Sequence, residues 1–271
     1  MNEIKQVRKP AVFVGLPCHI EGLRLFQQFH KEFIELIPYC ISTFCGGYKS
    51  YHWIDKLLSL LGIDPSKVIS LKFRTLGWPG ELEIKDIEGK VVRYPYPAYG
   101  SLTDDVEPRR CALCIDALGE LADISIGDAW LPHYLEKRKS GGWSIAIARS
   151  NKGKELLEEI KKYDLAFIKP ISISEVVKAQ YQNIEFKKIR QNTRRWVFKI
   201  LGGRLPTYDG GYLQHFGNPF VEMRTILRII VNEWEWEKIS WKRIIAKSFK
   251  RALKFKKKVK KYASKTGHTR Y

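Results

Sequence analysis

The cysteines are the side chains of this sequence with the clearest capacity for chemistry. Cys111 and Cys114 form a C-x-x-C motif, whose two-residue spacer lets both thiolates face one metal ion or cluster from a single turn. Cys18 and Cys45 each follow a predicted strand, at the turn into a helix. Because loops at the ends of neighbouring strands converge in α/β folds, four thiolates from three turns can close around one iron–sulfur cube.

Spacing leaves two other interpretations of the cysteines open. A structural zinc site has suitable spacing in Cys40, Cys45, Cys111 and Cys114. A redox dithiol fits less well, because such C-x-x-C motifs open a helix directly after a strand, whereas the polar loop 108–110 precedes this one. Cys40 itself falls in mid-strand, which favours a small buried residue. The odd total of five cysteines, without an export signal, argues against a secreted disulfide framework.

Hydrophobic periodicity predicts the elements that position these residues. Ala11–Gly15 indicates a short strand that turns into a helix, Phe33–Ile41 indicates a second strand, and a second helix ends at Gly62. This βαβα opening favours a partly parallel sheet. The later predicted elements are strands at Val68–Phe73, Glu81–Ile87, Lys90–Tyr94, Ala122–Gly127 and Ser144–Ala148, a helix at Lys152–Tyr163, and mainly helix beyond Pro170.

These elements predict the α/β class, with a mixed sheet, a βαβα opening, a β-hairpin insertion and a mainly helical C-terminal extension. The expected domains are residues 1–170 with the cysteine site, a helical extension over 171–237 and a basic tail over 238–271. A chain of 271 residues with 44% hydrophobic side chains can bury a core, which excludes overall disorder. No apolar stretch approaches the ~20 residues that cross a bilayer, and the run Ala11–Leu16 is too short for a signal peptide. A cytoplasmic protein is therefore expected.

The formal net charge of +19 is concentrated in the tail. Lys238–Tyr271 holds 14 of the 48 basic residues and none of the 29 acidic ones, which leaves the rest of the chain at +5. An amphipathic helix is predicted there, since the apolar residues share one side of a helical wheel: Trp241, Ile244, Ile245, Phe249, Ala252, Phe255, Val259 and Tyr262. Its aromatics do not interleave with the charges, so we expect an anionic membrane surface or self-packing, and not nucleic acid.

Several short motifs occur in a fixed order along the first part of the chain. They are Val14–His19, Phe44–Ser50, Phe73-Arg74, Gly77-Trp78, Cys111–Cys114, Ala122–Trp130 and Gly142–Ser144. Over about residues 10–165 this series resembles the C-terminal domain of the beta subunits of coenzyme F-420 (F420) hydrogenases and dehydrogenases. That family also includes a plant chlorophyll-cycle reductase.

The resemblance implies an iron–sulfur flavoprotein oxidoreductase subunit that passes electrons between an organic substrate, such as the deazaflavin F420, and a [4Fe-4S] cluster through FAD. Carried over by position, the cluster ligands are Cys18, Cys45, Cys111 and Cys114. Two turns would contribute to FAD binding, and the cofactor-binding residues expected there are Gly15, Pro17, His19, Gly127, Asp128, Trp143 and Ser144. No catalytic residue is assigned.

Members of the family normally carry a further segment before the first of these motifs, and many bacterial members begin with a ferredoxin-like run of cysteines. Three explanations are therefore open: a partner subunit supplies the N-terminal or ferredoxin-like part, the chain is a split or truncated form, or it holds its cluster without full catalytic competence. The chain alone is expected to bind FAD weakly. The alternative hypothesis is a non-catalytic, zinc- or metal-stabilised binding module of the same fold at the membrane surface. The two hypotheses differ in colour, because only an iron–sulfur protein is brown.

Overall fold

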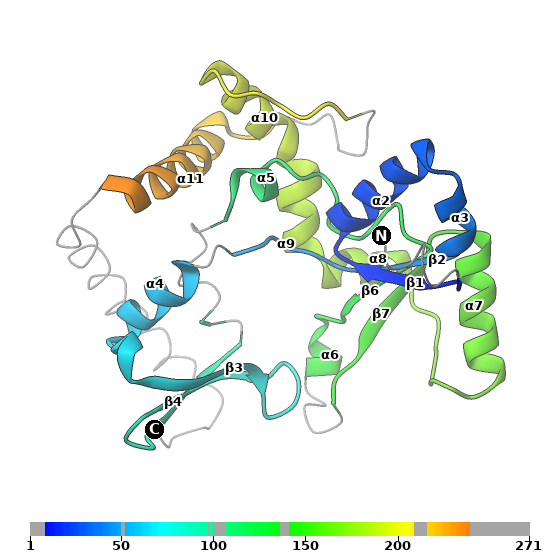
Figure 1. The fold of residues 1–271 in the computed structure, drawn as a ribbon, viewed down its shortest axis with the longest axis horizontal. Coiled ribbons are helices and arrows are strands. Elements are labelled where there is room, and N and C mark those ends of the chain that lie inside the picture. Colours follow the sequence, from blue (N-terminus) through cyan, green and yellow to red (C-terminus); the bar gives the residue numbers. More distant parts are fainter. Residues whose placement is uncertain are drawn as a thin grey trace. The chain divides into compact units, whose positions relative to one another are not determined.

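A computed structural model of the chain describes residues 9–49, 52–96, 98–99, 107–135, 141–208 and 216–238 (Figure 1). The amphipathic helix expected from Trp241 onward lies outside these residues. The described chain falls into two compact units. The first lies within residues 9–48, 110–137 and 142–226, and the second is built mainly from residues 49–109. Among the described helices, none combines the length and the apolar character that crossing a bilayer requires.

The first unit is organised around a four-stranded mixed sheet with strand order β1-β2-β6-β7. The strands are β1 (Val12–Gly15), β2 (Tyr39–Thr43), β6 (Ile124–Asp128) and β7 (Ser144–Ala148). The first three run parallel, and β7 is antiparallel to β6. The carboxyl ends of β1, β2 and β6 therefore lie along one edge of the sheet, where sites in α/β folds are usually built. This arrangement confirms the predicted fold class.

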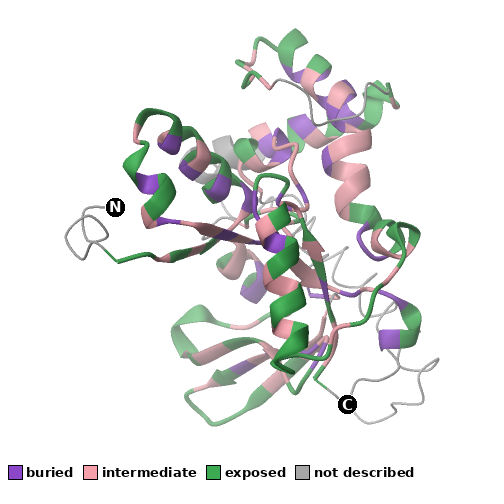
Figure 2. Cartoon of the chain, turned by 90° about the vertical axis from the view of Figure 1, so that its right-hand side faces the viewer, coloured by how far each residue is buried: buried purple, intermediate pink, exposed green. Residues whose placement is uncertain are grey.

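Helices α2 (Pro17–Phe29) and α3 (Glu32–Leu36) lie beside β1 and β2 (Figure 1). Their buried sides form one core cluster with Ile20, Leu23, Phe33, Ile37, Cys40 and Ala122. The helices of this unit carry buried residues on one side and exposed residues on the other (Figure 2). Such amphipathic helices cover a sheet face and leave their polar side in water.

The predicted start of the second strand, at Phe33, is wrong. Residues Glu32–Leu36 form helix α3, and the strand is confined to Tyr39–Thr43. An apolar run such as Phe33–Ile37 suits either conformation, and tertiary contacts select the helix here. The Phe33 ring packs edge-on against Phe26 of α2, with ring centroids 5.1 Å apart, and the Gln27 amide donates a hydrogen bond to the Phe33 carbonyl.

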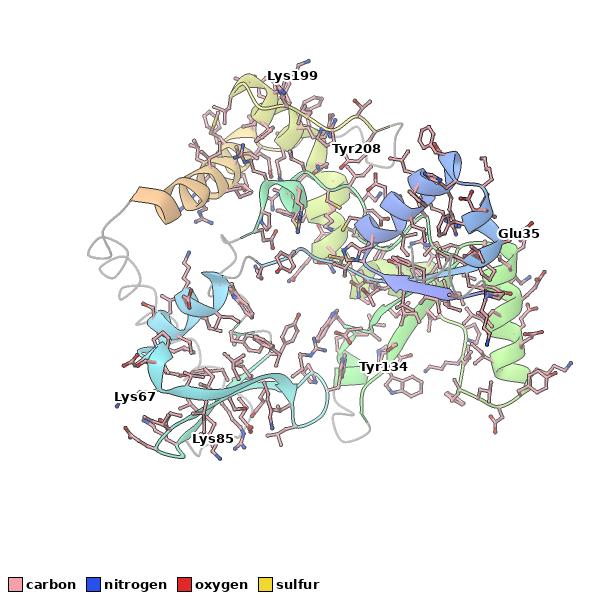
Figure 3. All side chains as sticks on the ribbon, viewed as in Figure 1. Glu35, Lys67, Lys85, Tyr134, Lys199 and Tyr208 are labelled. Carbon is pink, nitrogen blue, oxygen red and sulfur yellow. The ribbon has the colours of Figure 1, made fainter. Side chains whose placement is uncertain are left out.

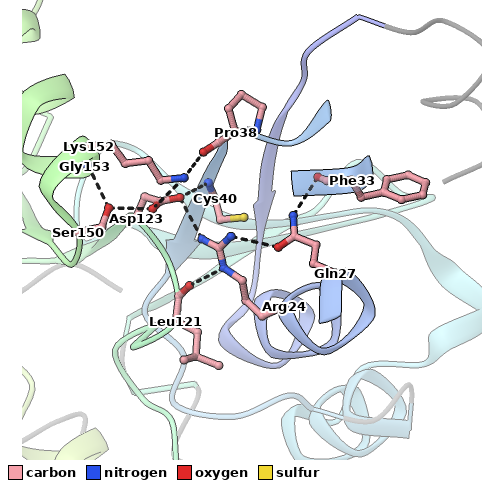
Figure 4. Close-up of polar contacts among 10 residues, drawn as sticks. All are labelled: Arg24, Gln27, Phe33, Pro38, Cys40, Leu121, Asp123, Ser150, Lys152 and Gly153. Carbon is pink, nitrogen blue, oxygen red and sulfur yellow. Dashed lines mark hydrogen bonds and ion pairs between the residues drawn. The ribbon is translucent and has the colours of Figure 1, made fainter. Parts of the chain in front are cut away.

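Asp123 joins three elements of the first unit from a buried position (Figure 4). Its carboxylate accepts hydrogen bonds from the Cys40 N–H at 2.8 Å, the Ser150 hydroxyl at 2.8 Å and the Arg24 guanidinium at 3.1 Å. Burial alone would raise the pKa of Asp123. The hydrogen bonds and the nearby Lys152 and Arg24 charges outweigh burial and hold the pKa below its ordinary value.

Helix α7 (Asn151–Lys162) follows β7 and begins at Ser150, whose hydroxyl accepts a hydrogen bond from the Gly153 N–H. This N-cap satisfies one of the free donors of the first turn. Gly153 lies so close to the start of β6 that an added Cβ would stand 2.0 Å from the Asp123 carbonyl oxygen. The absence of a side chain at Gly153 therefore lets α7 pack onto the sheet.

The described residues beyond Pro170 are mainly helical, as predicted. Its elements are α8 (Ile173–Ala179), α9 (Tyr181–Ile184), a π-helical turn (Glu185–Ile189), α10 (Gln191–Ile200) and α11 (Pro219–Lys238). A capping box between Ser172 and Glu175 starts α8. Glu222, at the start of α11, is buried and accepts hydrogen bonds of 2.6 Å from both Arg190 and Arg194. This double ion pair ties α11 to α10.

The second unit contains the predicted β-hairpin insertion. Its elements are α4 (His52–Leu61), a 3-10 turn (Pro65–Lys67), β3 (Val68–Thr75), β4 (Glu81–Asp86) and β5 (Val91–Pro95). The three strands form an antiparallel sheet in that order. Buried residues Leu57, Leu58, Leu82, Ile84 and Tyr99 pack α4 onto this sheet.

Candidate functional site

Three of the four expected ligand cysteines come together at the carboxyl end of the parallel strands. Cys45 follows β2, Cys111 lies in the short helix α5 (Arg109–Ala112), and Cys114 follows that helix. The Cys45 N–H donates a hydrogen bond to the Ala117 carbonyl at 2.9 Å. The Tyr48 N–H donates to the Cys111 sulfur at 3.4 Å. The turn after β2 is thus joined to the C-x-x-C loop at two points.

The charges around these sulfurs also identify them as one group. Burial raises the pKa of the Cys45 thiol, the Lys187 ammonium opposes that effect, and the neighbouring Cys111 and Cys114 thiols add to it. Burial also raises the pKa of Cys114, and Lys187 again opposes it. A thiolate formed in this group, for example by a bound metal, would be stabilised by the Lys187 charge.

Cys18, the fourth expected ligand, is exposed in the first turn of α2. Glu21 lies one helical turn further along α2. The half-buried phenol of Tyr208 (Figure 3) lies close enough to both Glu21 and Cys114 to feel their charges. Burial, followed by these two groups, raises the pKa of Tyr208 to about 12, and its hydroxyl donates to the Leu113 carbonyl at 3.3 Å. The start of α2 and the C-x-x-C loop therefore share a neighbour.

A row of polar side chains that the sequence analysis did not single out covers this site. We call it the polar row, and its members are Gln180, Asn183, Lys187, Gln191 and Arg194. The spacing of three or four residues places them on one side of the helical segment. Gln180, Lys187, Gln191 and Arg194 are at most 2% exposed. Spacing alone indicates a shared helix face, but polar faces usually meet water, so no local signal predicts this burial.

The second half of the polar row holds the C-x-x-C loop through its backbone carbonyls. Arg194 donates to the Ala112 carbonyl at 2.9 Å, and Gln191 donates to the Leu113 carbonyl at 2.6 Å. The Lys187 ammonium donates to the Asp116 carbonyl at 3.0 Å and lies 3.5 Å from the Cys114 sulfur. These bonds satisfy buried carbonyls and fix the loop conformation that aims the two cysteines.

The first half of the polar row reaches the neighbouring strand ends. Gln180 donates to the Asp128 carbonyl at 2.7 Å and accepts a bond from Asn183 at 2.9 Å. The Asn183 amide lies against Gly46, where an added Cβ would stand 2.7 Å from its oxygen. One helical segment therefore contacts the end of β6, the turn after β2 and the C-x-x-C loop.

The cysteine group has the donor chemistry of a thiolate-ligated cluster. It combines three partly buried thiols, an N–H donor to one sulfur and a buried ammonium beside another. Within the described ranges, no three or more His, Cys, Asp or Glu side chains are arranged to hold a single metal ion.

Cys40, which the zinc alternative requires, lies away from this chemistry. Its side chain is fully buried in the apolar cluster beneath α2, and its N–H donates to the Asp123 carboxylate. Burial raises the pKa of the Cys40 thiol. This environment is that of a small core residue.

Four of the residues expected to bind FAD lie on β6 and β7 or next to them. Asp128 pairs with Ser144 across the two strands, so the structure brings these two together. Gly127 has a packing role, because an added Cβ would stand 2.0 Å from the Phe44 ring. The Asp128 carbonyl is bonded to Gln180.

Trp143, directly before β7, belongs to an aromatic cluster on the first unit. Its ring stacks on Tyr134 of α6 (Pro132–Leu135; Figure 3) with centroids 5.3 Å apart, and it meets the edge of Phe167 at 5.8 Å. The Lys169 ammonium lies 5.3 Å from the centre of the Trp143 ring. Such a cation over an aromatic face stabilises the cluster.

The other three expected FAD residues lie at the turn from β1 into α2. Gly15 ends β1, and Pro17 is the first residue of α2. Proline has no N–H, and at this position of a helix no hydrogen bond is lost, because the first N–H groups have no partner within the helix. The His19 ring nitrogen Nδ1 accepts a hydrogen bond of 3.4 Å from the Leu16 N–H. His19 therefore helps to form the turn itself.

Comparison with known proteins identifies the family of this chain. Residues 9–173, more than half of the chain, match the family described as the C terminus of the beta subunit of coenzyme F420 hydrogenase/dehydrogenase. The chain belongs to this family. All four expected ligand cysteines fall inside the matched residues of the F420 hydrogenase/dehydrogenase family, whereas the polar row lies beyond them. The resemblance stated from the sequence motifs is confirmed.

Two curated relatives are similar over part of their length. The chain is 26% identical over 216 residues to the coenzyme F420-dependent sulfite reductase of Methanocaldococcus jannaschii, covering 73% of this chain and 32% of that protein. It is 24% identical over 156 residues to the chloroplastic 7-hydroxymethyl chlorophyll a reductase of Oryza sativa subsp. japonica, covering 56% of this chain and 31% of that protein. The chain thus spans about a third of the length of these relatives.

A solved structure shares the fold. It is the F420-reducing [NiFe] hydrogenase complex from Methanosarcina barkeri, one chain of which matches with a TM-score of 0.50 and 19% identity. The match covers 73% of this chain and 65% of the hydrogenase chain. At this identity the likeness concerns the fold alone, and it agrees with the mixed sheet and helical extension described above.

Proposed function

We propose that this chain is an oxidoreductase subunit in which Cys18, Cys45, Cys111 and Cys114 hold a [4Fe-4S] cluster that exchanges electrons with FAD. The observation that carries the proposal is the grouping of three thiols, Cys45, Cys111 and Cys114, at the carboxyl end of the parallel strands, with the Lys187 ammonium 3.5 Å from the Cys114 sulfur. Cys18, exposed in the first turn of α2, is the proposed fourth ligand, and Tyr208, which donates to the Leu113 carbonyl, also feels the charge of Glu21 on the same helix.

The cluster, when bound, supplies one-electron transfer, and a flavin beside it converts this into two-electron chemistry. The residues of the chain itself do three things. The Tyr48 N–H and the Lys187 ammonium stabilise negative charge on sulfur. The second half of the polar row fixes the loop between Cys111 and Cys114. The core beneath α2 excludes water from one side of the sheet.

For FAD we propose the two turns already described, with Gly15, Pro17 and His19 in one and Gly127, Asp128, Trp143 and Ser144 around the other. Backbone N–H groups at the start of α2 are suited to a phosphate. The closeness of Asp128 and Ser144 supports the second turn as one contiguous patch. Asp128 and Ser144 would then provide polar contacts to the cofactor.

The proposed electron donor or acceptor is a deazaflavin or another organic conjugated molecule. Two of the similar proteins are named as F420-dependent or F420-reducing, and the third reduces a chlorophyll. The hydrogenase relative is part of a complex, so we also propose a partner subunit. The basic tail over 238–271 would add peripheral contact with an anionic membrane.

Anaerobic purification followed by absorption spectroscopy and by iron, sulfide, zinc and flavin analysis tests this function. We expect a brown protein with equal amounts of iron and sulfide. We also expect the fluorescence of added FAD to be quenched when it binds the protein. A colourless chain containing zinc would contradict the proposal and support the alternative of a metal-stabilised binding module. A colourless chain without any metal would support a metal-free module of the same fold.

A further inference from the structure

We propose that Lys187 is a positioning residue that sets the reduction potential of the cluster through a fixed positive charge beside Cys114. This inference rests on the proposed function, because it concerns the cluster held by the four cysteines. It goes beyond it by assigning a role to a residue outside the part of the chain that matches the family, residues 9–173.

The position of Lys187 is fixed by its surroundings. The side chain is 1% exposed, and its ammonium is 3.0 Å from the Asp116 carbonyl oxygen and 3.5 Å from the Cys114 sulfur. Its positive charge also lowers the pKa of the Cys45 thiol, which lies in a different turn. A buried charge is costly unless it is compensated, so an ammonium held against the Cys114 sulfur is stabilised by negative charge on that sulfur.

Neither bonded partner of the ammonium, the Asp116 carbonyl or the Cys114 sulfur, carries a full negative charge while Cys114 is a thiol. A four-thiolate cluster would place negative charge directly at the Cys114 sulfur, 3.5 Å from the ammonium. The positive charge of Lys187 and the negative charge of the cluster then compensate each other in the buried site.

The backbone around Lys187 supports a role in the site. Lys187 lies in the π-helical turn Glu185–Ile189, a rare conformation that occurs often at functional sites. On one side of this turn, Gln180 is bonded to the Asp128 carbonyl at the end of β6; on the other side, Gln191 is bonded to the Leu113 carbonyl in the C-x-x-C loop. The Lys187 ammonium is thereby carried on an element anchored on both sides.

A fixed positive charge must affect the potential in one direction. Each cluster reduction adds one electron to a group that is already negatively charged by its thiolates. A nearby ammonium stabilises the reduced state more than the oxidised state, and in a buried site solvent screens this effect only weakly. Removing the charge should therefore make the potential more negative.

The test compares Lys187→Met, Lys187→Gln and Lys187→Arg with wild type in the full chain, reconstituted anaerobically with iron and sulfide. The measurements are iron content and a redox titration of the cluster followed by absorption and EPR. We expect Met and Gln to shift the oxidised-to-reduced ratio at fixed potential about tenfold toward the oxidised form, which is ~59 mV for one electron. Arg, which keeps the charge, should restore the wild-type potential.

Lys178→Met is the matched control, because it removes the same charge from an exposed position on α8. It should leave the potential unchanged. If wild type binds the cluster and Lys187→Met and Lys187→Gln have the wild-type potential, the proposed role of Lys187 is overturned, while the proposed cluster stands. A wild-type potential in Lys187→Gln but not in Lys187→Arg would also overturn the role of the Lys187 charge, since the hydrogen bond to the Asp116 carbonyl would then matter instead. A wild-type chain that takes up no iron would overturn the proposed function together with this inference.

Discussion

The Arg194 guanidinium donates a 2.9 Å hydrogen bond to the carbonyl oxygen of Ala112, which lies in the spacer of the C-x-x-C motif. The two residues are far apart in sequence, yet this bond helps to set the direction of the thiols on either side of Ala112. Arg194 is fully buried and also pairs with the buried Glu222 at 2.6 Å. The cysteine loop, α10 and α11 therefore share one buried polar network.

Replacing Arg194 with Met should lower the free energy of unfolding by about 3–5 kcal/mol, because it leaves Glu222 and the Ala112 carbonyl without this buried partner. Urea denaturation followed by circular dichroism measures the change. Arg224→Met on α11 is the control, since Arg224 is exposed and should cost at most about 0.5 kcal/mol. Equal stability of the two variants would show that the Arg194 network contributes little.

Asp123→Asn should destabilise the folded chain by about 2–3 kcal/mol at pH 7, because the carboxylate accepts charge-assisted bonds from Arg24 and from the Cys40 N–H. The folded pKa of Asp123 is below its ordinary value, so its stabilisation is present above pH ~4 and is lost as the pH falls through the folded pKa. Unfolding free energies measured from pH 7 to pH 2 should fall less steeply in the variant. Glu159→Gln, at an exposed site on α7, should keep the wild-type profile.

Two helical glycines should respond to alanine in opposite directions. Gly22 in α2 has no atom within 4 Å of an added Cβ, so Gly22→Ala should stabilise the chain by about 0.5–1 kcal/mol. An added Cβ at Gly153 would stand 2.0 Å from the Asp123 carbonyl, so Gly153→Ala should destabilise by about 1–3 kcal/mol. Thermal melts of both variants check this. A stabilising Gly153→Ala would mean that α7 does not pack onto β6 in this way.

Substituting single cysteines should separate ligands from core residues. Cys114→Ser and Cys111→Ser should each lose the bound iron after anaerobic reconstitution, because one missing thiolate leaves the cluster under-ligated. Cys40→Ser should keep the iron and lose about 1–3 kcal/mol of stability, since it places a hydroxyl in the apolar cluster beneath α2. Loss of iron from Cys40→Ser with retention in Cys45→Ser would show that the proposed ligand set is wrong.

Truncation before Lys238 should abolish adsorption to anionic vesicles and leave the iron content and spectrum unchanged. The deletion removes 14 basic residues but no proposed ligand. Adsorption of the full chain should weaken with added salt, because exposed charges are screened over a Debye length of ~8 Å at physiological ionic strength. Co-sedimentation with anionic and neutral vesicles measures it. Equal binding of the full chain to both vesicle types would contradict a charge-driven membrane contact.

Local pattern determined the class of the fold and the C-x-x-C pair among the candidate ligands. The βαβα opening, the β-hairpin insertion and the helical extension follow from apolar periodicity and turn residues, which act over a few neighbouring positions. The C-x-x-C spacing likewise is a local property of Cys111 and Cys114. These features were predictable because each depends only on residues close in sequence.

Tertiary contacts decided what local pattern left open. The run Phe33–Ile37 suits a strand or a helix, and packing of Phe33 on Phe26 selects the helix. Lys187 and Arg194 are charged residues of the kind that usually face solvent on a helix, yet they are buried against backbone carbonyls 71 and 82 residues earlier in the chain. Whether a polar side chain meets water or a distant carbonyl depends on long-range chain packing, and the residues next to it in sequence carry no record of that partner.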